Sequence, residues 1–184
     1  MADVADASYD SPLTGKLGTM QRLFAFLLLL PVLLVADGAS GLSWKMPAAW
    51  KALPERPMRA ATYSVPGIPE AGECAVFYFG PGQGGGVEAN ITRWEGQFPT
   101  KSGPTKRSAG NVAGHKITYL DLSGTYAWSS SPMSPDKVMK PDYRMLGAIV
   151  EAPQGSVFFK FTGPAKVIAA QEAAFKTMIQ GITK

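Results

Sequence analysis

The sequence predicts an α+β fold, in which a largely antiparallel sheet of about five strands packs against two helices in the order β-β-α-β-β-β-α. One observation is a hairpin near the end of the chain, where Ala152-Pro153-Gln154-Gly155 places Pro and Gly as a type I turn prefers. The others are two segments with helical periodicity, around residues 87–98 and 164–182. A length of 184 residues and an apolar share of 46% suit a single domain with its own core.

The expected strands are short runs rich in β-branched and aromatic residues, bounded by Gly and Pro. The third of them has a possible break at Gly124. Two polar segments, 99–113 and 129–142, are expected to be long loops, and loops of about 14 residues are often functional. The five expected strands are 58–65, 73–79, 116–126, 143–152 and 157–162.

Both expected helices follow a glycine-containing segment and have one apolar face. In the first, Val87, Ile91, Trp94 and Phe98 recur at helical spacing, and Pro99 ends the helix. The second begins at Gly163-Pro164, since proline suits a first helical turn. Its inner face is expected to comprise Val167, Ile168, Gln171, Phe175, Met178, Ile179 and Ile182.

The N-terminal 40 residues have the pattern of an extension followed by a secretory signal peptide. Arg22 precedes the apolar block Leu23–Ala36, and small residues follow it. The block is shorter than the about 20 residues of a membrane span. Cleavage is expected after Ser40 or Gly41, leaving 41–184 as an exported domain, periplasmic or secreted; an uncleaved anchor is the alternative. Met20 is an alternative start that would give a signal peptide of ordinary length.

The glycine-rich segment FGPGQGGGVEANITRWEGQF (79–98) contains a G-x-G-x-x-G match at Gly80, Gly82 and Gly85. A dinucleotide site also needs an acidic residue about 20 residues later, and a P-loop needs Lys-Ser/Thr; both are missing. The glycines are therefore interpreted as a sharp turn between a strand and a helix. A second hypothesis is an anion or small-molecule pocket, of a carrier or a hydrolase, near Gly80–Gly86 and Tyr78, because a helix start can hold an anion. Its candidate ligand-binding residues are Gly82, Gly84, Gly85, Asn90, Arg93, Trp94 and Gln97.

The chain has few residues suited to catalysis. His115 is the one histidine and Cys74 the one cysteine, and the patterns H-E-x-x-H, C-x-x-C and G-x-S-x-G do not occur. Cys74 is expected to be a buried small apolar residue, and His115 to lie at a turn or on the surface. These observations favour a protein that is not an enzyme and that needs no metal or other cofactor.

The basic residues of the two polar segments form a candidate partner-binding site. Removal of residues 1–40 leaves sixteen of the 18 basic and ten of the 14 acidic residues, a net charge of +6. A basic exported domain favours an acidic partner protein or envelope component over nucleic acid, and no stable membrane insertion is expected after cleavage. A structural accessory subunit, with an apolar patch around Trp44, Trp50 and Trp128, is another possibility. The candidate partner-binding residues are Lys101, Lys106, Arg107, Lys137 and Lys140.

Four segments resemble an uncharacterised group of exported bacterial proteins over roughly residues 44–182: 58–61 (MRAA), 80–98, 144–148 (RMLGA) and 158–164 (FFKFTGP). That resemblance implies no catalytic residues. The expected element order is also similar to the PsbP-like α/β/α sandwich, which serves non-catalytic binding proteins. The second likeness implies a fold and no specific function, because one fold hosts many functions.

Overall fold

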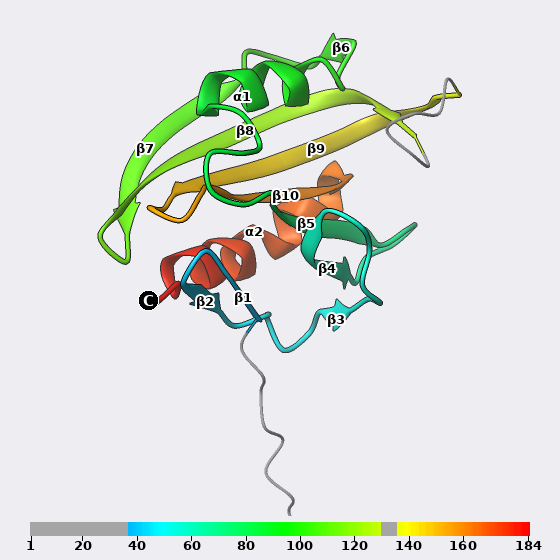
Figure 1. Cartoon of the computed structure of the whole chain (residues 1–184). Coiled ribbons are helices and arrows are strands. Elements are labelled where there is room, and N and C mark those ends of the chain that lie inside the picture. Colours follow the sequence, from blue (N-terminus) through cyan, green and yellow to red (C-terminus); the bar gives the residue numbers. More distant parts are fainter. Residues whose placement is uncertain (1–36, 130–135) are drawn as a thin grey trace, which may run out of the picture. The chain divides into compact units, whose positions relative to one another are not determined.

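The computed structural model describes residues 37–129 and 136–184, and all structural statements refer to these residues. In this part of the chain there are ten strands and two helices (Figure 1). In chain order they are β1 (Asp37–Ala39), β2 (Leu42–Trp44), β3 (Lys51–Ala52), β4 (Arg59–Val65), β5 (Gly72–Tyr78), α1 (Val87–Glu95), β6 (Thr100–Lys101), β7 (Lys106–Val112), β8 (His115–Trp128), β9 (Val138–Glu151), β10 (Val157–Pro164) and α2 (Ala165–Gln180).

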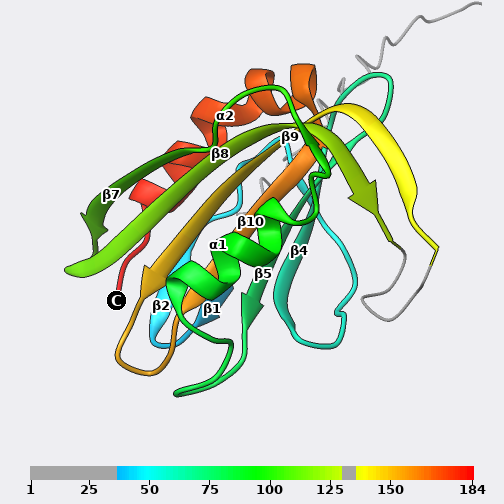
Figure 2. The same ribbon diagram turned by 90° about the horizontal axis from the view of Figure 1, so that it is seen from above.

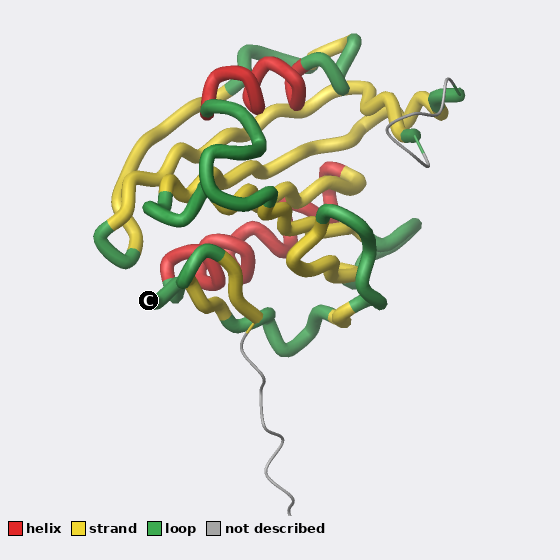
Figure 3. Tube along the Cα trace, viewed as in Figure 1, coloured by secondary structure: helices red, strands yellow, loops and turns green. Residues whose placement is uncertain are grey.

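One large antiparallel sheet organises the described residues, with α1 on one face and α2 on the other (Figures 1 and 3). The strands follow the order β3-β4-β5-β10-β9-β8-β6, and β7 also pairs with β8. The predicted fold class is therefore confirmed. The expected number of about five strands is too low, since this sheet has eight strands and β1 and β2 form a separate hairpin.

The two expected loops contain strands that the sequence pattern did not reveal. Residues 106–112 form β7, which pairs with β8 from Lys106↔Asp121 to Val112↔His115. The segment 138–142 belongs to β9, which begins at Val138. Both loop predictions are wrong for these residues, because pairing with the long strand β8 overrides their polar composition.

The face under α2 carries the larger apolar core. Val167, Ile168, Phe175, Met178 and Ile179 are the buried residues of α2. They pack with the inward residues of β4, β5, β9 and β10 and with the β1–β2 hairpin. The hairpin lies beside the C-terminal segment, since Ser43 and Thr183 exchange two backbone hydrogen bonds of 2.9 Å. Trp44 and Trp50 are buried in this core, so the expected apolar patch around them is absent from the described surface.

The opposite face carries a smaller apolar core, covered by α1. Ile91 and Trp94 of α1, together with Phe98, pack on residues of β8, β9 and β10. The indole of Trp94 lies on Gly147, where an added Cβ would come within 2.6 Å of the ring. A glycine is therefore required at this position for α1 to approach the sheet so closely.

The first described residues, 37–40, make hydrogen bonds to the folded domain. Asp37 accepts a 2.5 Å hydrogen bond from the Tyr63 hydroxyl, and Tyr63 accepts one of 2.6 Å from Trp44 Nε1. The Ser40 hydroxyl donates to the carbonyl of Gly155 at 2.6 Å. The predicted cleavage sites after Ser40 and Gly41 thus fall in the turn between β1 and β2.

The predicted signal peptide, Leu23–Ala36, lies outside the described residues. Within the described ranges, no helix combines the length and apolarity needed to cross a membrane.

Candidate functional site: the open face of the sheet

The glycine-rich turn is closed by a side chain of the following helix. Asn90 is 1% exposed, and its Nδ2 donates to the carbonyls of Gly84 and Gly86 at 2.8 and 2.9 Å. Gly84 has φ +85°, and a Cβ there would lie 2.6 Å from the Phe79 ring. Because carbonyl oxygens point at the Asn90 amide, the polar groups here satisfy one another. The interpretation as a sharp strand-to-helix turn fits this geometry.

The other predicted ligand-binding residues point to different places, because they lie at different positions around and beyond α1. Arg93 donates to Asn90 Oδ1, whereas Trp94 is buried in the smaller core. Gln97 lies beyond the end of α1 and contacts Lys160 of β10. Gly82 has φ +68° in an exposed part of the turn, with no atom near its added Cβ. The structure therefore brings Gly84, Gly85, Asn90 and Arg93 together, and connects Gln97 to a different group of residues.

The five predicted partner-binding residues lie in several different places. Lys101 and Arg107 contact Glu95, and Arg107 also contacts Glu88, so acidic residues of α1 balance them. Lys106 instead lines a cleft on the α2 face. Lys140 contacts Glu70, and Lys137 is exposed next to the start of β9.

Part of the α1 face has no helix over it. Figure 2, viewed from this side, shows α1 along the middle of the sheet, with β5 and then β4 beyond it. Thr62 of β4, Ala75 of β5 and Lys160 of β10 lie side by side in register across these three strands. Side chains alternate between the faces of a strand, so Lys160 points away from the core that holds Phe159 and Phe161.

We call this region the open face. It comprises Arg56, Arg59, Thr62, Glu73, Lys160 and Thr162.

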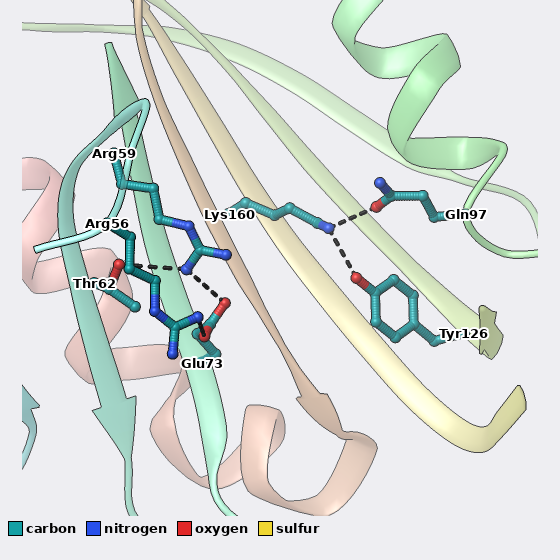
Figure 4. Close-up of polar contacts among 7 residues, drawn as sticks. All are labelled: Arg56, Arg59, Thr62, Glu73, Gln97, Tyr126 and Lys160. Atoms are coloured by element: carbon teal, nitrogen blue, oxygen red, sulfur yellow. Dashed lines mark hydrogen bonds and ion pairs between the residues drawn. The ribbon is translucent and has the colours of Figure 1, made fainter. Parts of the chain in front are cut away.

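Lys160 is a partly buried cation that contacts only neutral groups among the described residues. Its Nζ donates to Gln97 Oε1 at 2.5 Å and to the Tyr126 hydroxyl at 3.1 Å, as Figure 4 shows. The same nitrogen lies 5.0 Å from the centroid of the Tyr126 ring. No carboxylate of the described chain lies within ion-pair distance of it. An ammonium group held in this way has unused capacity to attract an anion.

Two arginines share one carboxylate at the other side of the open face. Arg59 Nη1 donates to Glu73 at 2.8 Å and to Thr62 Oγ1 at 3.3 Å, and Arg56 reaches Glu73 at 3.4 Å (Figure 4). The Arg59 guanidinium also lies 5.4 Å from the centroid of the Phe77 ring. With Lys160, three basic groups face one acidic group, which gives the open face a net charge of +2.

Thr162 adds a polar group that lacks a partner within the described chain. It lies two residues after Lys160 on the same face, between Glu73 and Met145 in the register. Its hydroxyl oxygen is buried without a hydrogen bond in this part of the protein. Buried polar groups are generally hydrogen-bonded, so this hydroxyl is an exception, and its burial keeps it out of reach of a ligand on the surface.

On the α2 face, an ion-pair network borders a cleft of about 420 Å³ between α2 and strands β7 to β9. Arg144 makes two 2.8 Å hydrogen bonds to Asp121 and contacts Glu172 at 2.9 Å. A second, more apolar groove of about 600 Å³ lies between the end of α2 and residues 43–47. Neither concave region is lined by the glycine-rich turn.

We expect the ion pairs of Arg144 with Asp121 and Glu172 to make the stability of the fold depend on pH in the acidic range. Hydrogen bonds from Arg144 lower the pKa of Asp121, and contacts with Lys176 and Arg144 lower that of Glu172. Because the folded-state pKa values are depressed, this stabilisation is complete above the unfolded values of about 4 and is lost as pH falls through the folded values. The melting temperature should fall in that range and fall less in Asp121→Asn. The exposed Glu88→Gln is the control; an identical acid dependence in all three proteins would contradict the assignment.

Cys74 and His115, the one cysteine and the one histidine, lie on different strands, β5 and β8. Cys74 is buried, and burial raises the pKa of its thiol, so it is an inert core residue, as predicted. His115 is the first residue of β8, directly after the turn Ala113-Gly114, which agrees with the expected position at a strand start next to a turn. In the ranges 37–129 and 136–184, no group of three or more His, Cys, Asp or Glu side chains is placed to hold a metal ion.

Comparison with known proteins identifies the fold. No family model matches the chain, and no curated protein matches its sequence. Among solved structures, it is similar to the solution structure of cyanobacterial PsbP (CyanoP) from Synechocystis sp. PCC 6803, with a TM-score of 0.51. The match covers 80% of this chain and 89% of that chain at 9% sequence identity. The fold is PsbP-like. The likeness to an uncharacterised exported family has no support from a family model.

Sequence reasoning did not predict any charged residue of the open face as part of a site; these residues are Arg56, Arg59, Glu73 and Lys160. The available signal was a lysine within the otherwise apolar strand sequence VFFKF, where an alternating pattern assigns it to the opposite face. The residues that surround Lys160 belong to distant parts of the chain, and the sequence does not reveal the strand order that brings them together.

Proposed function

We propose that this protein is an exported, non-enzymatic binding or accessory protein, and that its open face recognises an acidic segment of a partner protein in the cell envelope. The observation that supports this most is Lys160, a partly buried cation with neutral partners on a face with net charge +2.

The arrangement suits carboxylates presented by a protein. Lys160 of β10 and Arg59 of β4 lie on neighbouring parts of one sheet face, with Ala75 of β5 between their strands. An incoming carboxylate at Lys160 would form a charge-assisted hydrogen bond, which is stronger than a neutral one. A second carboxylate would compete with Glu73 for the arginines. Complementary charge of this kind steers association and fixes register.

The similarity to a solved structure supports the fold and gives no information on the partner. PsbP-like proteins share the sandwich, but a likeness at 9% identity transfers no partner. The proposal therefore rests on the residues of the open face.

We expect the open-face variants Lys160→Gln and Arg59→Gln to lose partners that the unchanged protein captures from its own envelope extract. The capture should be weakened by salt, because exposed charges are screened within about 10 Å at ordinary ionic strength. Removing a charge that meets a partner carboxylate should weaken binding by about 2 kcal/mol or more. The measurement is quantitative mass spectrometry of proteins retained at low and at high salt.

Lys166→Gln is the matched control, since it removes the same charge from an exposed position on α2, on the opposite face. A partner captured equally well by all variants, or one insensitive to salt, would show that the open face is not the site. Melting curves of each variant exclude a loss of folding as the cause.

A further inference from the structure

The two edges of the large sheet differ in length and in protection. At one edge, β3 consists only of Lys51 and Ala52, and Pro54 follows shortly after it. An edge this short offers little to a neighbouring strand. At the other edge, β7 runs for seven residues and pairs with β8 alone. Figure 2 shows β7 at the margin of the sheet, with no described element along its outer side.

The turn at the end of β7 determines which of its backbone groups face outward. Val112 and His115 flank the two-residue turn Ala113-Gly114, whose φ angles are +50° and +78°. Two positive φ values are typical of a tight hairpin turn, whose flanking pair exchanges both hydrogen bonds. Because bonded and non-bonded pairs alternate along an antiparallel ladder, every second residue of β7 has its N–H and C=O groups on the outer side. Counted back from Val112, these residues are Arg107, Ala109 and Asn111.

These outward groups have no backbone partner among the described residues. Outside the ladder with β8, no backbone hydrogen bond of the described chain involves residues 106–112. Proteins usually protect such an edge with a proline, a bulge or charges along the strand. In β7 the register is continuous, proline is missing, and the charged residues are confined to the start, Lys106 and Arg107. The small residues Ser108-Ala109-Gly110 at its centre leave room for another strand to approach.

We propose that β7 pairs antiparallel with β7 of a second copy of this protein, about a twofold axis at Ala109. This register joins Ala109 to Ala109 of the second copy, and Arg107 to Asn111 on either side of the axis. All the outward residues then meet partners of the same kind. The pairing forms about six hydrogen bonds, because each bonded pair of an antiparallel ladder exchanges two. Twofold contacts of one surface with itself are the commonest among homo-oligomers.

The charges of the strand favour this occupant. In the antiparallel register, Lys106 and Arg107 of the two copies lie at opposite ends of the new strand pair, whereas a parallel register would place them side by side. Like charges directly opposite one another are destabilising. An acidic peptide would gain little at Arg107, because Glu88 and Glu95 already hold its guanidinium at 2.9 and 3.0 Å. The inference is independent of the open face, which lies on β4, β5 and β10.

Hydrogen exchange of the backbone amides tests the pairing directly. The dimer fraction of the unchanged protein, measured by sedimentation, should rise between about 5 and about 500 μM, since an interface built on one strand pair is small. The amides of Arg107, Ala109 and Asn111 should exchange about tenfold more slowly when about nine-tenths of the protein is dimer, because exchange then proceeds through the remaining monomer. The amides of Ser108 and Gly110 already face β8 and should be protected at every concentration.

Substitutions at the exposed Ala109 separate pairing from folding. Ala109→Pro removes an outward N–H, which an edge strand tolerates, and should weaken association about tenfold or more. Ala109→Lys places two ammonium groups opposite each other and should weaken association about threefold or more at low salt. Ala109→Ser keeps the N–H and the charge, and should associate like the unchanged protein. Melting curves check that each variant is folded.

A protein that is monomeric at every concentration would overturn the proposal. So would a dimer that forms equally well in Ala109→Pro and Ala109→Lys, or one in which the outward amides of β7 exchange as fast as in the monomer.

Discussion

Replacing Trp94 with alanine is expected to destabilise the protein by about 3–5 kcal/mol, the range for removing a large aromatic side chain from a core. Trp94 is 4% exposed, and its indole rests on Gly147 between α1 and the sheet. Its loss removes the contact that holds α1 against β8 and β9. Because Gln97 follows α1 and contacts Lys160, this change should also loosen the cation of the open face.

Trp128→Ala is the matched comparison, because it removes the same side chain from an exposed position. Surface substitutions usually change stability by about 0.5 kcal/mol or less. Urea unfolding of the two variants measures the difference. If both substitutions lower the free energy of unfolding by the same amount, Trp94 is not the residue that holds α1 against the sheet.

Removing residues 37–41 is the second change with a large expected effect. The truncation deletes β1 and with it Asp37, whose carboxylate accepts the hydrogen bond of the Tyr63 hydroxyl. The same hydroxyl accepts a hydrogen bond from Trp44 Nε1. A hydrogen bond to a charged group contributes about 1.5–3 kcal/mol, and the strand pairing and the Ser40 contact add to it. We expect a chain that begins at Leu42 to be less stable by about 3 kcal/mol or more than one that begins at Asp37.

Single substitutions separate the hydrogen bond from the strand. Asp37→Ala should lose much of this stability, whereas Asp37→Asn keeps an oxygen that accepts from Tyr63. The truncation also bears on processing, because cleavage after Ser40 or Gly41 would produce a chain without β1. Equal melting temperatures for the chains that begin at Leu42 and at Asp37 would show that β1 contributes nothing to stability.

Much of the fold was predictable because its central elements have strong local patterns. The apolar runs of β4, β5 and β10 and the periodic apolar residues of α1 and α2 each indicate their own structure. The irregularity after Gly124 was also anticipated, and it appears as a register shift in the pairing of β8 with β9.

The missed strands lack such patterns for physical reasons. In β7, six of the seven residues are exposed or half-buried, so no apolar alternation marks it, and its pairing with β8 defines it. The first part of β9 contains Pro141, which argues against a central strand. That proline is tolerated because β10 does not extend along this part of β9.

The candidate site was less predictable than the fold. The sequence pointed to Asn90 and Arg93 near the glycines, where the structure shows their polar groups bound to each other and to the turn. The open face depends on strand order, which places β10 between β9 and β5, a strand that lies much earlier in the sequence. Gln97 is the one predicted ligand-binding residue that the structure connects to this face.

The most direct test of the central claim is an NMR titration of the isotope-labelled protein with sodium polyglutamate, an acidic polymer of defined chemistry. We expect amide shifts to concentrate on β4, β5 and β10 around Thr62, Ala75 and Lys160, to diminish with salt, and to be lost in Lys160→Gln. Shifts concentrated instead on β7 around Lys106 and Arg107, or shifts unchanged in Lys160→Gln, would contradict the assignment of the open face as the binding site.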